Sequence, residues 1–167
     1  MMIEAKNLIN LPIASEEDQE KIGEIIDIVI EPENGRVLGF LVKEGGMFST
    51  VKALSVVDIR DWDTNGIVTR TFENIVEPKE IIRLNELYEK NIILLNMKAK
   101  TESGKSLGKV ENYLIDTETE MVVKYYLKDL LGNTRVLPND KVKEITDEVI
   151  FLDEVSEPPI EAESAIA

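Results

Sequence analysis

The stretch KIGEIIDIVIEPENGRVLGFLV, residues 21–42, has a counterpart later in the chain, SLGKVENYLIDTETEMVVKYYL, residues 106–127. When Gly23 is aligned with Gly108, apolar positions fall on apolar positions without a gap. The aligned pairs include Ile25 with Val110, Val29 with Leu114, Val37 with Val122, Phe40 with Tyr125 and Val57 with Val142. A match that keeps its register over so many positions predicts that the chain contains two copies of one unit.

Each copy has the pattern of β-structure. Residues 23–31 are rich in β-branched apolar side chains and end at the turn signal PENG, residues 32–35, after which the apolar pattern resumes. In the second copy the corresponding turn is DTETE, residues 116–120. Short strands separated by turns at near-regular spacing predict a small β-barrel in each copy.

The segment between the copies has a helical pattern instead. In residues 77–91, EPKEIIRLNELYEKN, Pro78 suits a first helical turn, and Ile81, Leu84 and Tyr88 repeat on one face. We expect a short amphipathic helix that packs on one barrel or lies between the two.

These patterns define the predicted fold class: mainly β, with two tandem small antiparallel β-barrels joined by a short α-helix. The first unit is expected over residues 1–75, the helical linker over 76–91 and the second unit over 92–155. The last residues, 156–167, are rich in Pro, Glu and Ala and are predicted to be disordered.

The composition excludes several classes of function. With 19 basic and 33 acidic side chains the net charge is -14, which disfavours direct binding of nucleic acid or an anionic membrane and suits a basic protein partner. The chain has no cysteine and no histidine, which excludes thiol catalysis, disulfides and the usual zinc sites. It also lacks a run of about 20 apolar residues, as a membrane-spanning helix requires. These features predict a soluble cytoplasmic protein without a cofactor.

The motifs of both copies resemble those of the PRC-barrel family. The family's opening K-x-G-x-V motif is matched by KIGEI at residues 21–25 and by SLGKV at residues 106–110. Its closing motif, with Pro after an aliphatic residue and Val at the end, is matched by VLPNDKV at residues 136–142. The first copy has VKALSVV at residues 51–57 in that place, without the proline.

The resemblance implies a six-stranded antiparallel barrel in each copy and a non-catalytic, protein-binding role. Members of the family include the cytoplasmic domain of the photosynthetic reaction-centre H subunit, the C-terminal domain of the ribosome maturation factor RimM and small sporulation-associated proteins. This chain has neither the membrane helix of the first nor the separate N-terminal domain of the second, so neither role is carried over. We expect an adaptor that binds another protein; the alternative is a ribosome-associated assembly factor that acts through a ribosomal protein. The barrel edges and the linker helix leave a homodimer open.

One short motif is similar to the start of a calcium loop. In DWDTNG, residues 61–66, Asp61, Asp63 and Asn65 are spaced as oxygen ligands. A calcium loop of this kind needs a glutamate at its twelfth position, where the chain has Phe72. The flanking segments also have strand patterns. We therefore predict a hairpin in which Asn65 and Gly66 supply positive φ angles, with weak calcium binding as the alternative.

No catalytic residue is assigned. Among so many carboxylates some pairs would suit an acid/base hydrolase by chance, which is a third alternative. The candidate protein-binding residues are two apolar pairs next to glycine-rich turns. Met47 and Phe48 follow Gly45 and Gly46, while Leu130 and Leu131 precede Gly132. Exposed pairs of this kind can anchor a partner; alternatively, they plug a barrel end or pack against residues 79–90.

Overall fold

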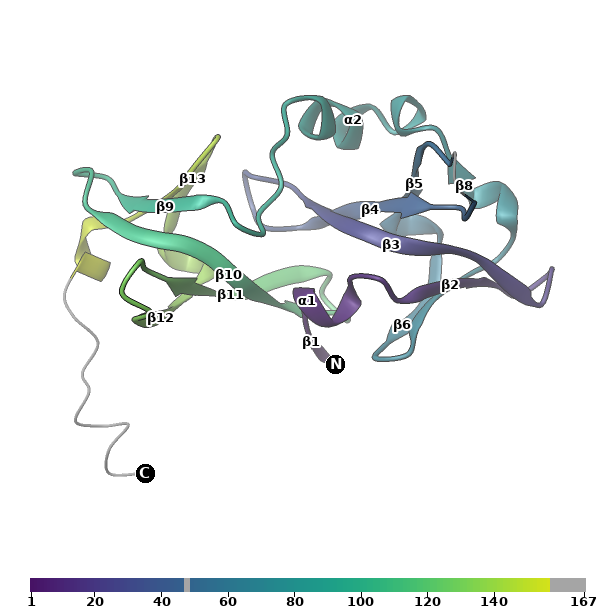
Figure 1. The fold of residues 1–167 in the computed structure, drawn as a ribbon, viewed down its shortest axis with the longest axis horizontal. Coiled ribbons are helices and arrows are strands. Elements are labelled where there is room, and N and C mark those ends of the chain that lie inside the picture. Colours follow the sequence, from purple (N-terminus) through teal and green to yellow (C-terminus); the bar gives the residue numbers. More distant parts are fainter. Residues whose placement is uncertain (47–48, 157–167) are drawn as a thin grey trace.

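The computed structural model describes residues 1–46 and 49–156. The chain is mainly β, with two seven-stranded sheets and a short helix between them in the sequence (Figure 1). The first sheet contains β2 (Pro12–Ser15), β3 (Glu20–Ile30), β4 (Val37–Lys43), β5 (Val51–Ser55), β6 (Ile59–Asp63), β7 (Gly66–Thr69) and β8 (Ile75–Val76). The second contains β1 (Met2–Glu4), β9 (Lys98–Thr101), β10 (Ser106–Asp116), β11 (Met121–Lys128), β12 (Thr134–Pro138), β13 (Val142–Ile145) and β14 (Val149–Phe151).

The helices are few and short. The α-helices are α1 (Ala5–Leu8) and α2 (Ile82–Glu89). Single 3-10 turns are η1 (Val56–Asp58), η2 (Phe72–Asn74), η3 (Pro78–Glu80), η4 (Asn139–Lys141) and η5 (Asp153–Ser156). None of the described helices is both long and apolar enough to cross a membrane. The predicted tail is residues 156–167; apart from Ser156, it lies outside the described residues.

The two sheets repeat one strand order. The first runs β6-β7-β2-β3-β4-β5 and the second runs β13-β14-β9-β10-β11-β12. In both, the two strands that come first and last along the chain are neighbours in the sheet and pair in parallel, β2 with β7 and β9 with β14. Each sheet thus has the six-strand motif that the resemblance implies, but one of its pairings is parallel instead of antiparallel. The reason is that η1 and η4 carry the chain from one side of the sheet to the other instead of reversing it in a hairpin. The last strand of each unit, β7 or β14, therefore runs parallel to the first.

The N-terminal strand belongs to the second sheet. β1 pairs antiparallel with β10, with Ile3 opposite Ile115, although it precedes the first sheet in the chain (Figure 1). β10 can accept it because its first half pairs with β9 and its second half is open on that side. Residues 2–4, which the sequence assigns to the first unit, thus complete the other one.

Backbone hydrogen bonds and one hydrophobic core join the sheets. Val37 N donates to Glu120 O at 2.8 Å, and Val122 N donates to Gly35 O at 2.9 Å, so the β3–β4 turn meets the β10–β11 turn. A single cluster of buried residues extends from one sheet into the other. The two sheets therefore pack directly against each other instead of being connected by a linker alone.

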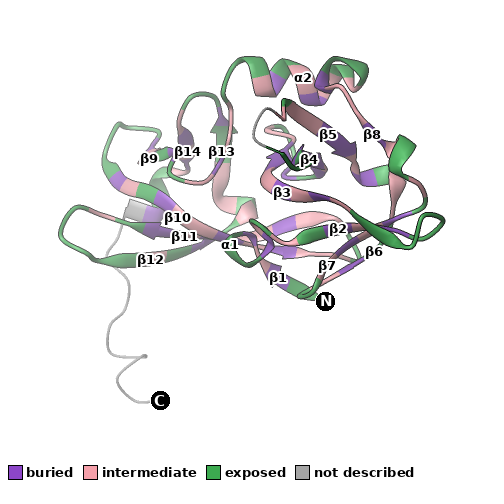
Figure 2. Ribbon diagram, turned by 45° about the vertical axis from the view of Figure 1, so that its right-hand side comes forward, coloured by how far each residue is buried: buried purple, intermediate pink, exposed green. Residues whose placement is uncertain are grey.

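The linker helix covers the first sheet alone. Leu84 and Leu87 of α2 pack on Val29, Leu41 and Ala53 of β3, β4 and β5. In Figure 2, α2 lies over these strands and alternates between buried and exposed residues. The predicted continuous helix is interrupted at Ile81, whose φ of -113° and ψ of 89° are not helical. Of the two arrangements expected for this helix, the structure has the one on a single sheet.

Candidate functional site

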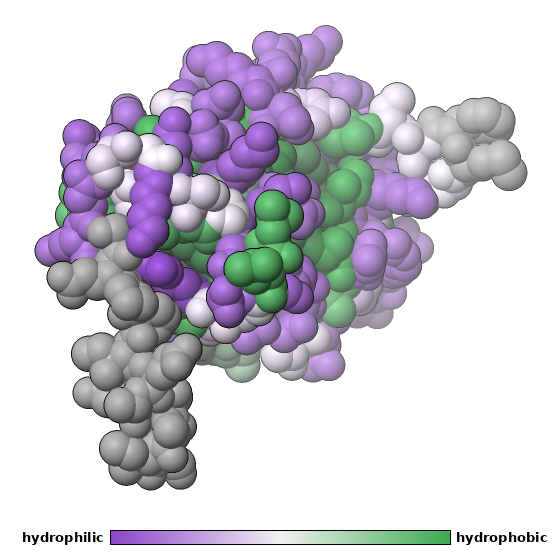
Figure 3. Space-filling view, turned by 60° about the vertical axis from the view of Figure 1, so that its left-hand side comes forward, coloured by the Kyte–Doolittle hydropathy of each residue, from purple (hydrophilic) through white to green (hydrophobic). Residues whose placement is uncertain are grey.

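The tip of the β11–β12 hairpin carries two exposed leucines. Leu130 and Leu131 have relative exposures of 102% and 88%. Figure 3 shows the face on this side of the molecule, where hydrophobic groups stand out from a mainly hydrophilic surface. The alternative that these two side chains plug a barrel end or pack against residues 79–90 is therefore wrong. Met47 and Phe48, the other predicted pair, lie outside the described residues.

Asp129 holds the leucines in this position. Its Oδ1 accepts hydrogen bonds from the backbone N–H of Leu131 and of Asn133, both at 2.9 Å. The Asn133 side chain donates a hydrogen bond to Asp129 Oδ2 at 3.1 Å. Gly132 has a φ of 83°, which residues other than glycine rarely adopt. The Asn133 side chain, followed by the backbone donors, lowers the pKa of Asp129. The turn is thus fixed by its own polar groups, and the leucines are left free to contact another molecule.

The calcium candidates lie in a hairpin, as predicted. β6 pairs with β7, and Asp63 lies opposite Gly66 across the turn. The Asp63 carboxylate accepts a hydrogen bond from Asn65 N at 2.7 Å, so it caps the turn. Within the described ranges, no three acidic or other metal-binding side chains gather as a metal site would require.

The prediction that Asn65 and Gly66 both supply positive φ angles is correct for Gly66 only. Gly66 has a positive φ of 143°, whereas Asn65 does not. The requirement for glycine comes from a close approach as well: a Cβ at position 66 would lie 2.3 Å from the carbonyl oxygen of Pro12. Gly66 therefore serves the parallel contact between β7 and β2, a role that the local sequence does not reveal.

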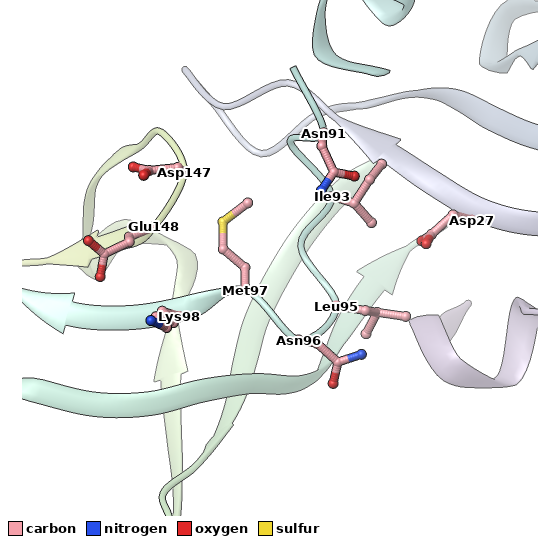
Figure 4. A pocket seen from close by; sticks show the side chains of 9 residues that line it. All are labelled: Asp27, Asn91, Ile93, Leu95, Asn96, Met97, Lys98, Asp147 and Glu148. Atoms are coloured by element: carbon pink, nitrogen blue, oxygen red, sulfur yellow. The ribbon is translucent and has the colours of Figure 1, made fainter. Parts of the chain in front are cut away.

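A groove of about 560 Å³ lies between the two sheets. Figure 4 shows Asp27 on one side of it and Asp147 and Glu148 on the other, with Met97 and Leu95 between them. The Asp27 carboxylate lies across the groove from those of Asp147 and Glu148, and Glu148 pairs with Lys100 at 3.2 Å.

The sequence analysis did not identify Asp27 as a site residue. In the structure, Asp27 stabilises the backbone of its own strand. It lies at a bulge in β3, where its Oδ1 accepts a hydrogen bond from Ile28 N at 2.9 Å. Asn112, the aligned residue of the second copy, makes the same contact with Tyr113 N at 3.0 Å, also at a bulge. Burial raises the pKa of Asp27. The repeat explains why an Asp or Asn is needed here without any ligand.

The first sheet lies within a segment whose sequence matches a known family. Residues 1–75 match the family model of the PRC-barrel domain. The match includes all of the first sheet except its last strand residue, Val76, and also includes β1. No curated protein shows a significant match to the sequence. One PRC-barrel domain is thereby established, whereas the second predicted PRC-barrel domain lies outside the match.

Proposed function

We propose that the chain is a cytoplasmic, non-catalytic adaptor built of two PRC-type units, which binds another protein through Leu130 and Leu131. The observation that carries this proposal is the exposure of two adjacent leucines at a turn whose backbone is already satisfied. Apolar side chains held out from a polar surface are typical anchors of protein interfaces, because burying them removes apolar area from water.

The PRC-type assignment of the second unit is part of the proposal. Its support is the strand order, which is the same in both sheets down to the parallel pair and the 3-10 turn between the fourth and fifth strands of each unit, η1 in the first and η4 in the second. The non-catalytic role is what resemblance to the PRC-barrel family implies, since the family is known for binding proteins.

A capture experiment tests the adaptor. The full chain, immobilised, is exposed to lysate of the source organism beside the double variant Leu130→Asp, Leu131→Asp. A matched control, Val57→Asp with Ile82→Asp, removes two apolar side chains that are 82% and 75% exposed elsewhere on the surface. The protein that the wild type captures is then purified, and its affinity for each variant is measured by calorimetry.

We expect the leucine variant to bind the purified partner at least tenfold more weakly and the control to bind within twofold of wild type, with Trp62 fluorescence confirming that all three chains are folded. Equal binding by the leucine variant would overturn the proposal that this hairpin tip is the docking site. Failure of the wild type to capture any protein would overturn the adaptor function itself.

A further inference from the structure

Three lysines lie in a row across the second sheet, next to the hairpin tip. Lys109 of β10 is directly opposite Lys128 of β11 on one side and Lys98 of β9 on the other. All three side chains are exposed. Directly opposed residues of antiparallel strands have Cβ atoms about 5 Å apart, and like charges at that separation destabilise the sheet. This lysine row therefore costs stability in the free protein.

In the described part of the chain, none of the three lysines forms an ion pair. Glu111 and Glu148, which line the same groove, each pair with another lysine. Glu111 pairs with Lys6 at 2.7 Å, and Glu148 pairs with Lys100 at 3.2 Å. The hydrogen bond and charge of Lys6 lower the pKa of Glu111, and the charge of Lys128 lowers it less than Lys6 does. The row is a local excess of positive charge on a chain whose net charge is -14.

The lysine row and one of the exposed leucines share a groove. The groove has a volume of about 430 Å³, and its walls include the three lysines and Leu130. Asp129 also lines the groove, but its carboxylate accepts hydrogen bonds within the hairpin turn. A ligand in this groove would meet ammonium groups along the strands and an apolar side chain at one end.

The first sheet shows that the fold does not require this arrangement. At the same register it has Pro12, Glu24 and Lys43 on the three strands, so an acid faces a base. In place of the two leucines it has Gly45 and Gly46. A unit of the same topology therefore holds together with a favourable charge pair and no apolar tip. The second sheet differs in both features at once, which points to a ligand rather than to folding.

We propose that the lysine row and Leu130 bind an acidic segment of a protein partner, one that carries several carboxylates and an apolar side chain beside them. This inference names the partner class for the hairpin tip and so rests on the proposed adaptor function. The whole-chain charge alone favours a basic partner, but a short acidic segment contacts only the local positive charge. A long nucleic acid would also meet the acidic surface around the row, where like charges repel it.

The test uses the full chain and defined probes. A fluorescently labelled nine-residue peptide with four glutamates and one leucine is titrated by anisotropy at low salt. Three forms of the protein are compared: the wild type, the variant Lys109→Glu and the control variant Lys43→Glu. Lys43 occupies the position in the first sheet that is equivalent to Lys128 in the second. Lys109→Glu restores the charge pattern of the first sheet, so it is expected to fold and to melt no lower than the wild type.

We expect Lys109→Glu to weaken binding of the peptide at least tenfold and Lys43→Glu to change it less than twofold. Replacing the peptide's glutamates by glutamine is expected to abolish binding, and replacing its leucine by serine to weaken it severalfold. Wild-type affinity in Lys109→Glu, or no binding by the wild type at low salt, would overturn the inference. Tighter binding of a single-stranded oligonucleotide of equal charge would also overturn it, in favour of nucleic acid.

The two proposals fail separately. Loss of peptide binding in Lys109→Glu, together with unchanged partner capture by the leucine variant, would keep the acidic-segment site and reject the hairpin tip as the adaptor surface. Unchanged peptide binding by Lys109→Glu, together with loss of partner capture by the leucine variant, would support the adaptor function and reject the acidic-segment site.

Discussion

Two buried tyrosines of the second sheet differ in how their hydroxyl groups are satisfied. The rings of Tyr113 and Tyr125 lie 6.3 Å apart, and burial raises the pKa of both. Tyr125 donates a hydrogen bond to Asn139 Oδ1 at 3.1 Å. The Tyr113 hydroxyl has no hydrogen-bond partner among the residues that the structure describes. A buried polar group without a partner costs free energy, because it has lost its hydrogen bonds to water.

Substituting each tyrosine by phenylalanine should therefore have opposite effects. Tyr113→Phe is expected to leave the free energy of unfolding unchanged or to raise it by about 1 kcal/mol, since it removes an unsatisfied hydroxyl. Tyr125→Phe is expected to lower it by about 1 kcal/mol, since it leaves Asn139 without its donor. Urea unfolding of both variants measures this. A clear loss of stability in Tyr113→Phe would mean that a buried water satisfies the hydroxyl.

At the scale of elements, one ion pair fastens the linker helix to the first sheet. Arg83 of α2 donates from Nε and Nη2 to the two carboxylate oxygens of Glu31, at 2.8 and 2.7 Å, and from Nη1 to Glu86 at 2.9 Å. The Arg83 hydrogen bonds lower the pKa of Glu31. The stabilisation is present above the ordinary pKa of a glutamate, about 4.3, and is lost as the pH falls through the lowered pKa in the folded state.

Glu31→Gln is accordingly expected to cost about 0.5–1 kcal/mol at pH 7, a modest value because Arg83 is partly exposed to solvent. The difference from the wild type should shrink as the pH is lowered below about 4. Urea unfolding at a series of pH values measures it. Glu20→Gln is the control, since the structure places this exposed glutamate in no ion pair with a described residue. A difference that stays constant down to pH 2 would show that the ion pair is not its source.

The elements that local sequence determines were predicted, and those that depend on distant contacts were not. The turns at residues 32–35 and 116–120 lie where their residue types require them, and the linker has its helix. The parallel pairing of β2 with β7 joins segments some 50 residues apart, and no local pattern encodes it. β1 is too short to show a period, so its place beside β10 follows only from the open edge there.

The candidate site was predicted in its apolar part only. Leu130 and Leu131 were found because they stand next to a turn glycine, where side chains tend to be exposed. The lysine row was missed because the copies were aligned by their apolar residues. The signal was present in the same alignment, where Glu24 of the first copy corresponds to Lys109 of the second. This change of charge at an aligned position is the sequence signal for the acidic-segment site that we propose.

For the molecule as a whole, the shared core predicts a single unfolding transition. Ile3 is 2% exposed and packs in the second sheet, although it belongs to the N-terminal end of the chain. Ile3→Ala is expected to lower the free energy of unfolding by about 2–4 kcal/mol, the usual cost of a cavity left by a large aliphatic side chain. Because the sheets unfold together, both should be destabilised.

Two probes separate the sheets in this measurement. Trp62 fluorescence reports on the first sheet, where its ring meets Phe40, and near-ultraviolet circular dichroism of Tyr113 and Tyr125 reports on the second. We expect the urea midpoints of both signals to coincide in the wild type and to shift together in Ile3→Ala. A shift of the tyrosine signal alone would show that the sheets unfold independently.

The pairing of β1 with β10 also orders events during synthesis of the chain. The N-terminal residues leave the ribosome first, but their partners around Asp116 follow only after more than a hundred further residues have been added. At about 5–20 residues per second, that delay is on the order of 5–20 s. The first sheet, β2 to β8, can form in that interval, while residues 2–4 stay without a partner strand. The pairing of β1 with β10 therefore has to wait until the residues around Asp116 have been made, and it follows rather than precedes the formation of the first sheet.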